Sequence, residues 1–397
     1  MLSFSELLPV GLGLLLALGT LFVLSSAGTL TVAEHRFGSV DGLRGILALL
    51  VVFHHAGVWY IFVREGEWRA PPGNFYNQIG QGSVSLFFMI TAFLFTRKIL
   101  DARFSGKPLD WRRLWVARFY RLAPLYLVSI LIMGGLVAVL TEVELHESPY
   151  TLLRNCMSWL SFTVLGNPDV NGYTDTWQLN AGVAWSLPYE WCFYVCLPLI
   201  ALLLGTRPPV RFVVLSLLGA AFFLYAMSRA MWVPKLSEAM MFAGGFVAAL
   251  TMRVRWLARF ARTPVAALLV IGLLGCEYTQ FSSAFGYAQL LLLSAAFVLL
   301  AAGNDVFGLL TSRAARTLGA ITYSVYLLHG ILLFVVFGLV VGHERARSFT
   351  AGEHWALVLL LVPVLLVVSA LSYRWIELPA MRFAQLRAGV LPASKLD

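Results

Sequence analysis

Long hydrophobic runs separated by short polar loops extend along the chain to about residue 376. A helix needs about 20 apolar residues to cross a bilayer. Eleven stretches of about that length can be placed, approximately at residues 7–27, 44–63, 83–100, 122–140, 187–205, 210–228, 236–252, 264–281, 287–303, 319–341 and 355–376. The alternating pattern of a membrane barrel is absent, so the spans are expected to be helices whose backbone groups are satisfied internally. The pattern therefore predicts an all-α polytopic membrane protein.

Composition supports this class of protein. The chain has 397 residues, 59% of them hydrophobic and 12% charged, with a mean hydropathy of +0.80, which a soluble domain of this length does not show. No linker, low-complexity run or obvious repeat interrupts the pattern. We therefore expect one helical core over residues 31–380, preceded by an extra transmembrane helix within 1–30 and followed by a cytoplasmic tail, 381–397.

The distribution of basic residues predicts topology rather than a nucleic-acid partner. The net charge is +9, but the basic residues are spread over many short loops and no soluble domain carries a basic face. With the N-terminus outside and the C-terminus inside, 22 of the 29 Lys and Arg fall in or beside cytoplasmic loops, as in inner-membrane proteins. Treating residues 150–166 as a span would invert every later loop, so this stretch is interpreted as interfacial or re-entrant.

The start of the chain favours a membrane span, and its cysteines do not predict a metal site. Residues 1–27 carry Glu6 and no leading Lys or Arg, which favours an uncleaved span over a signal sequence. The four cysteines lack the spacing of a metal site, and no metal is expected. Cys156 and Cys276 both fall on the outer side in this topology, and whether they form a disulfide is left open.

Two ionisable side chains are predicted to share one face of the second span. The stretch VDGLRGILALLVVFHHAGVWY begins with Asp41 and Arg44 close to its start and has two histidines near its middle. At about 100° and 1.5 Å per residue, His55 lies within about 20° of Arg44 and about 16 Å farther along the axis. His54 points about 100° away. Ionisable residues inside a membrane are functional candidates; the alternative is that His55 binds a neighbouring helix and Arg44 only anchors the span.

A pair of arginines stands at the cytoplasmic end of another span. Arg118 and Arg121, in RRLWVARFYRLAPLYLV, are three residues apart and therefore on one helical face. Guanidinium groups suit phosphate oxygens because they donate in a planar fork. The alternative is that these arginines only fix the orientation of the span.

Two further stretches place polar groups in apolar surroundings. In WSLPYEWCFYVCLP, Glu190 stands near the outer end of a span beside several aromatic residues, and it requires a partner or a task. In LGAITYSVYLLHGILL, His329 lies near mid-membrane with Tyr326 one turn earlier. A single histidine there is also compatible with a structural hydrogen bond between helices.

These stretches, in this order, resemble the membrane acyltransferase-3 family, bacterial enzymes that move acyl groups from acyl-coenzyme A to hydroxyl acceptors. Arg44 and His55 match the family's Arg-x10-His motif. Arg118 and Arg121 match its Arg-x-x-Arg motif, and WSLPYE is similar to its Trp-Ser-Leu-x-x-Glu. SLFFMITAFLF, YSVYLLH and SYRWIELP resemble other helices of the family, so the likeness covers about residues 39–380.

The resemblance implies a ten-helix core to which the first span is added. Where the family's second helix has Ser-Gly-Phe, this chain has Thr91, Ala92 and Phe93, which questions close backbone packing at that point. Several relatives carry an appended external esterase-like domain. None is present in this sequence, so the core is expected to act alone or to hand over to a separate periplasmic transferase.

The resulting prediction is an inner-membrane O-acyltransferase that moves an acyl group, in the first instance acetyl from acetyl-CoA, to a hydroxyl of a saccharide or glycolipid acceptor. His55 would act as general base or transient acyl carrier, Arg44 would hold the thioester end, and Glu190 would orient the acceptor. Arg118 and Arg121 would bind the nucleotide of the donor. The residues expected to line the acceptor site or cavity are Trp185, Ser186, Tyr326, His329 and Asp41.

Three alternatives stay open at this point. A glycolipid transporter or flippase would also carry ionisable residues inside a helical bundle. A non-catalytic membrane subunit would leave the arginine motifs without a ligand. An acyltransferase could also act on a small molecule such as a macrolide. The sequence does not fix the acceptor, the acyl chain or the oligomeric state.

Overall fold

The computed structural model describes residues 4–26, 38–229 and 235–387, and they are helical apart from loops and one isolated bridge between Val170 and Tyr173. This confirms the all-α membrane class. Eight helical segments in these residues are long and apolar enough to cross a membrane, and a bent pair of helices passes the same test together. Each of the eleven predicted spans falls on helix, while their number as membrane crossings stays a prediction.

The described chain divides into two compact units. Unit 1 comprises Met1–Arg97 and Leu236–Ala370, and unit 2 comprises Lys98–Lys235 and Leu371–Asp397. The helices of unit 1 are α1 (Phe4–Ser26), α2 (Gly38–Glu65), most of α3 (Phe75–Ser105), α8 (Leu236–Ala239), α9 (Phe242–Thr251), α10 (Arg255–Ala261), α11 (Pro264–Gln280), α12 (Tyr287–Ala301), α13 (Arg313–Ala320), α14 (Thr322–Phe334), the π-helical η3 (Val335–Val340), α15 (His343–Ser348) and nearly all of α16 (Ala351–Ser372).

Unit 2 contains the remaining helices. They are α4 (Trp111–Leu140), α5 (Pro149–Leu160), the short 3₁₀ helices η1 (Thr176–Asn180) and η2 (Val183–Ser186), α6 (Leu187–Leu203), α7 (Val210–Arg229), the π-helical η4 (Tyr373–Glu377) and α17 (Leu378–Arg387). α5 is not among the helices long and apolar enough to span. Its Asn155 is buried and donates to the carbonyl of Asp169 at 2.8 Å, so the predicted interfacial piece is tied to its own loop.

Helix ends follow local sequence signals. The side chain of Asp110 accepts a hydrogen bond from the backbone N–H of Arg113 at 2.9 Å and begins α4. Ser148, Thr263 and Ser312 cap α5, α11 and α13 in the same manner. Such caps satisfy N–H groups that have no partner inside the helix.

Several helices extend beyond the predicted spans, because an apolar run reflects the thickness of the hydrocarbon layer and not the length of the helix. α2 begins at Gly38, so Asp41 and Arg44 lie within it rather than at its edge. The helix of the final span continues through α17 to Arg387, which places part of the predicted tail in a helix. Residues 27–30 and 388–397, which belong to the predicted N-terminal segment and tail, lie outside the described residues.

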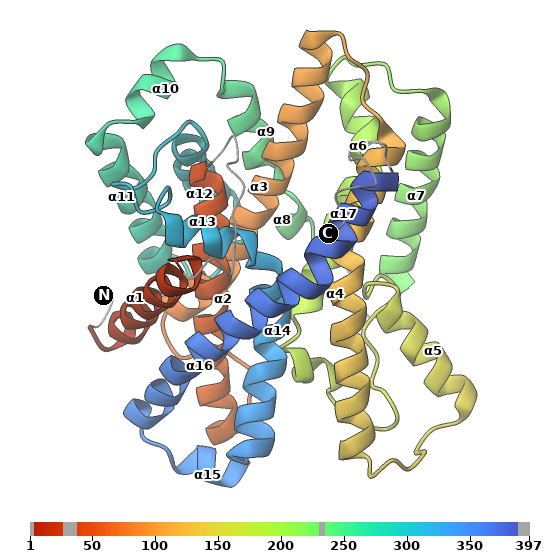
Figure 1. Ribbon diagram of the computed structural model, residues 1–397, viewed down its shortest axis with the longest axis vertical. Helices are drawn as coiled ribbons and strands as arrows, with labels where there is room; N and C mark the ends of the chain where they lie inside the picture. Colours follow the sequence, from red (N-terminus) through yellow and green to blue (C-terminus); the bar gives the residue numbers. More distant parts are fainter. Residues whose placement is uncertain (1–3, 27–37, 230–234, 388–397) are drawn as a thin grey trace. The chain divides into compact units, whose positions relative to one another are not determined.

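In unit 1, the backbones of α2 and α13 approach very closely. A Cβ added to Gly319 would lie 2.1 Å from the carbonyl oxygen of Asp41, and one added to Gly42 would lie 1.9 Å from that of Leu310 in the turn before α13. Only glycine fits at such contacts. Figure 1 shows α14, which follows α13 in the chain, running alongside α2. The tight crossing thus fixes where α14 meets the histidines of α2.

The four thiols are free. Burial, together with the nearby Glu147 carboxylate, raises the pKa of Cys156, so its thiolate form is disfavoured and its reactivity is low. Cys192 and Cys196 stand one turn apart in α6 and are both partly buried.

Candidate active site

The two neighbouring histidines of α2 face different helices. His54 Nδ1 lies 2.7 Å from the carbonyl oxygen of Tyr76 in α3, and its ring fills the space over Gly80, where an added Cβ would come within 2.5 Å of it. His55 Nδ1 instead lies 2.9 Å from His329 Nε2 in α14. The predicted divergence of the two side chains is therefore present, and His54 has a packing partner of its own.

The pair of His55 and His329 is ordered by a second hydrogen bond. His329 Nδ1 lies 3.1 Å from the carbonyl oxygen of Val325, one turn earlier in α14. The His329 side chain is fully buried, whereas His55 stays partly accessible. The structure thus brings together two site candidates that are 274 residues apart in the chain.

This arrangement assigns the protons of the two rings when both are neutral. A carbonyl only accepts, so His329 Nδ1 must carry a proton and its Nε2 must be an acceptor. The proton shared with His55 therefore sits on His55 Nδ1. Nε2 of His55 is left as the nitrogen with the lone pair, which is the atom that a general base or nucleophile requires.

Asp41 and Arg44 lie near the start of the same helix. An Arg44 Nη1 lies 3.9 Å from Asp41 Oδ1, and both side chains are about one quarter exposed, at 28% and 22%. A partly exposed pair at this distance interacts weakly because water screens it. α2 is continuous from Gly38 to Glu65, so Arg44 and His55 share one helix, as expected.

Tyr326 lies beside the histidine pair. Its ring centroid is 6.2 Å from that of His329 and 6.1 Å from that of Phe87 in α3. Its position one turn before His329 follows from the three-residue spacing. Tyr326 thus places an aromatic ring beside His329.

In unit 2, the motif residues Arg118 and Glu190 meet at one tyrosine. The Tyr194 hydroxyl donates to Glu190 Oε1 and interacts with the Arg118 guanidinium. Tyr194 is buried, and Trp115 of α4 donates to its carbonyl oxygen at 3.0 Å. A guanidinium, a phenol and a carboxylate are therefore connected in one chain of hydrogen bonds.

Arg121 has a different partner in the same unit. Its Nη1 lies 2.5 Å from Oε2 of Glu377, whose side chain is fully buried. Glu377 belongs to the π-helical turn η4, and such turns often mark functional positions. A buried carboxylate needs its counter-charge. Arg121 thus satisfies Glu377, and its predicted donor-binding role has to be tested apart from that of Arg118.

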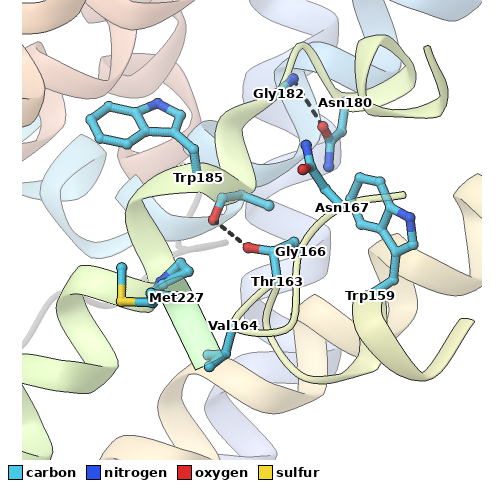
Figure 2. Close-up of a pocket in the computed structure, with 11 residues that line it drawn as sticks. Trp159, Thr163, Val164, Gly166, Asn167, Asn180, Gly182, Trp185 and Met227 are labelled. Carbon is cyan, nitrogen blue, oxygen red and sulfur yellow. Dashed lines mark hydrogen bonds between the residues drawn. The ribbon is translucent and has the colours of Figure 1, made fainter. Parts of the chain in front are cut away.

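A small recess in unit 2 lies next to the WSLPYE motif. Its cavity volume is about 30 Å³, and the empty space around it, including the solvent at its mouth, is about 430 Å³. Figure 2 shows Trp159, Asn167 and Asn180 gathered on one side and Trp185 on the other. Asn180 is buried, and its Nδ2 has no hydrogen-bond partner among the residues that the structure describes. The predicted cavity residue Trp185 therefore lines a recess that contains an unused amide donor.

Ser186, another predicted cavity residue, is buried beside this recess. Its hydroxyl donates to the carbonyl oxygen of Val183 at 3.5 Å. Three residues that line the recess have a positive φ, namely Thr163, Gly166 and Gly182. The Thr163 hydroxyl donates to the carbonyl oxygen of Ala184 at 3.1 Å, which ties the loop to η2.

Sequence reasoning missed a stripe of amides at the start of α3. Asn74, directly before α3, donates to the carbonyl oxygen of Thr279 in α11. Asn77 and Gln78 donate to those of Ser282 and Phe281 just after α11, and Gln81 accepts from the loop that follows. Their spacing of i, i+3, i+4 and i+7 was the available signal, because it places all four on one face. The carboxylate of Glu277 in α11 is also buried, with no hydrogen-bond partner among the described residues.

The departure from Ser-Gly-Phe in the second core helix is compensated by its neighbour. A Cβ added to Gly245 of α9 would lie 2.1 Å from the carbonyl oxygen of Met89 and 2.7 Å from Cβ of Ala92. Close packing at this point therefore exists. The glycine that permits it is on α9 instead of α3.

Comparison with known proteins gives two matches. A family described as an acyltransferase domain, the acyltransferase-3 group, matches residues 37–374. Acyltransferase MdmB of Streptomyces mycarofaciens is 26% identical over 392 residues, which cover 90% of this chain and 95% of that protein. No solved structure matches. The family match contains the histidine pair of unit 1 and the arginine motif of unit 2.

Proposed function

The chain belongs to the acyltransferase-3 family of membrane proteins, and we propose that it transfers an acyl group, acetyl in the first instance, from acyl-CoA to a hydroxyl of a saccharide or glycolipid acceptor. The observation that carries the proposal is the hydrogen bond of 2.9 Å between His55 and His329. It leaves Nε2 of His55 as a base on a partly accessible side chain. Acyl transfer to a hydroxyl requires such a group.

In the general-base route, His55 Nε2 takes the proton of the acceptor hydroxyl as its oxygen attacks the thioester carbonyl. The C–S bond then breaks, and the imidazolium returns the proton to the departing thiolate, so that no net proton is released. In the carrier route, Nε2 attacks the thioester carbonyl and the C–S bond breaks, which expels the coenzyme A thiolate and leaves an acyl-imidazolium. The acceptor hydroxyl then attacks the acyl carbon, the C–N bond breaks to regenerate neutral His55, and the hydroxyl proton goes to the thiolate. His329 positions His55 in both routes, since it holds the required tautomer.

The charge and hydrogen-bonding groups of the motif side chains suggest which of them bind the donor and which bind the acceptor. Arg44 is proposed to hold the thioester end of the donor. The forked guanidinium of Arg118 suits the phosphates of coenzyme A, with Arg121 contributing to the extent that its bond to Glu377 permits. Glu190 is proposed to orient the acceptor hydroxyls, since its carboxylate already accepts from Tyr194.

The saccharide proposal draws support from the recess of unit 2. Tryptophan rings offer apolar faces for sugar C–H groups, and amides such as those of Asn167 and Asn180 can donate to and accept from hydroxyls. The inner membrane, with the N-terminus outside and the C-terminus inside, is the proposed location because acyl-CoA is made in the cytoplasm and most basic residues fall on that side.

Mass analysis of cell-surface glycans from cells with and without the protein tests this proposal. We expect one acyl group to disappear when the protein is absent and to return with wild type. His54→Ala serves as the matched control for His55→Ala, since the two histidines are adjacent but face different helices. Unchanged glycans in the absence of the protein would contradict the proposed acceptor class.

Purified protein separates an enzyme from a transporter. An acyltransferase releases free coenzyme A only when acceptor is present, whereas a flippase moves its cargo without consuming acyl-CoA. Acceptor-dependent release of the thiol that is lost in His55→Ala is the expected result. Movement of a glycolipid across vesicles without consumption of the donor would favour the flippase instead.

A further inference from the structure

An apolar groove runs between three helices of unit 1, apart from the histidines. α9, α11 and α12 line it, and its cavity has a volume of about 480 Å³. Its lining is almost wholly apolar and includes Ala243, Val247, Leu269, Leu273 and Ala295. The hydroxyl of Thr251, which also lines it, donates to the carbonyl oxygens of its own helix at 2.9 and 3.0 Å. The groove therefore suits a hydrocarbon chain and offers little to a polar ligand.

Two of these helices are too short to cross the bilayer unaided. α9 has 10 residues and α12 has 15, so at 1.5 Å per residue they extend about 15 and 22 Å. The hydrocarbon core is about 30 Å thick. Short apolar helices perturb the lipid around them. A firmly held lipid chain in the groove would fill the space that they leave.

A stripe of arginines adjoins one end of the groove. α10 makes an angle of 80° with α11, as expected of a helix that lies along the membrane surface before a span. Arg255, Arg259 and Arg262 follow the spacing i, i+4 and i+7, so they share one face. All three are exposed and have no acidic partner in the part of the chain that the structure describes.

The arginine stripe and the groove are connected through the chain and through contacts. Thr251 at the end of α9 lines the groove, and α10 begins four residues later. A Cβ added to Gly303 would lie 3.5 Å from Arg262 Nε, and Gly303 stands one turn after Leu299, another lining residue. α10 contacts both α11 and α12 (Figure 1). Positive charge therefore lies at the mouth of an apolar groove.

We propose that the groove and the arginine stripe together bind one anionic phospholipid, with an acyl chain between α9, α11 and α12 and the phosphate against Arg255, Arg259 and Arg262. Charge complementarity selects this occupant, because clustered arginines attract anionic headgroups and bind phosphate oxygens in a fork. Trp256 is 69% exposed on the same helix, which suits the headgroup layer. The alternative is that the three arginines only fix the membrane topology. That alternative does not account for the apolar groove next to them.

The test measures lipid binding to the purified, delipidated full-length protein by native mass spectrometry. Phosphatidylglycerol and phosphatidylcholine with the same chains are the probes, and phosphatidylglycerol is expected to bind more tightly. The Arg255→Gln, Arg259→Gln double variant should lose about thirtyfold in affinity for phosphatidylglycerol and little for phosphatidylcholine. The corresponding double Lys variant keeps the charge but loses the forked contact, so its affinity for phosphatidylglycerol should lie between those of wild type and the double Gln variant.

The groove is tested by filling it. Ala295→Phe places a ring among the lining residues and should weaken both lipids, whereas Ala288→Phe, at an exposed position on the same helix outside the lining, should not. Glycerol phosphate, which lacks the chains, should not compete. Equal affinity of wild type for the two lipids would overturn the headgroup assignment. Identical binding by Ala295→Phe and Ala288→Phe would overturn the chain assignment. Neither result depends on acyltransferase activity.

Discussion

Replacing His329 tests whether this residue positions the base. His329→Ala removes one hydrogen-bond acceptor of the His55 ring, whose Nδ1 lies 2.9 Å from His329 Nε2, while the hydrogen bond of this ring to the backbone of Val51 remains. A neutral hydrogen bond contributes about 0.5–1.5 kcal/mol net, so the correctly oriented tautomer of His55 should fall in population by up to about tenfold. At metal sites, loss of a hydrogen bond that orients a ligating histidine lowers metal affinity or activity by about 10- to 100-fold. We therefore expect kcat to fall about 10- to 100-fold, with little change in donor KM.

The comparison with His55 makes the reasoning specific. His55→Ala removes the base itself and should cost about 10²- to 10⁴-fold. The double variant should be no worse than His55→Ala, because His329 acts only through His55. His329→Gln keeps an oxygen acceptor and should restore most of the activity. A merely structural role for His329 would not produce rescue by glutamine together with this non-additivity.

The assay is acceptor-dependent release of the coenzyme A thiol by purified protein, with thermal unfolding in detergent as the control for folding. If His329→Gln is as inactive as His329→Ala while both fold normally, hydrogen-bond acceptance is not the function of His329. If the double variant is far below His55→Ala, the two residues act separately. Either result refutes the tautomer argument.

Three further predictions follow from other parts of the chain. The Arg118→Lys variant should insert into the membrane normally but bind acyl-CoA more weakly by about 1–3 kcal/mol, because lysine loses the forked contact with phosphate. Unchanged acyl-CoA binding in a titration would mean that Arg118 only fixes the orientation of its helix. Arg121→Ala should lower stability by about 3–5 kcal/mol by leaving Glu377 uncompensated, and adding Glu377→Gln should recover part of the loss in a thermal unfolding assay; no change in the single variant would mean that the pair is dispensable. In a background without native cysteines, an impermeant thiol reagent applied to intact cells should label Leu145→Cys and spare Lys107→Cys, and labelling of the second would reverse the orientation.

The helical architecture was predictable because a membrane helix appears in the sequence as an apolar run whose length is set by the thickness of the bilayer. Breaks within those runs were not predictable. The run over 236–252 divides into α8 and α9, and the run over 319–341 divides near Ile321 between α13 and α14. Hydropathy is insensitive to such breaks because the residues at them are as apolar as their neighbours.

The candidate site was predictable only in part. Helical spacing separates His54 from His55 because it depends on one helix alone, and the structure gives them different partners. Contacts between helices depend on crossing points that no local pattern encodes. His329 was therefore identified as a polar residue in a membrane, but its position against His55 was not. Glu377 was overlooked for the same reason, since its partner Arg121 is 256 residues away.

Small residues at the crossing points allow the close approach of helices on which these long-range contacts depend. Gly319 permits the backbone of α13 to reach the carbonyl of Asp41, and His329 follows ten residues later on the next helix. A side chain at Gly319 would push α13 away from α2 and move His329 out of hydrogen-bond distance from His55. The glycine in LGAITYSVYLLH thus belongs to the site as much as the histidine does, because it sets the distance at which the histidine can act.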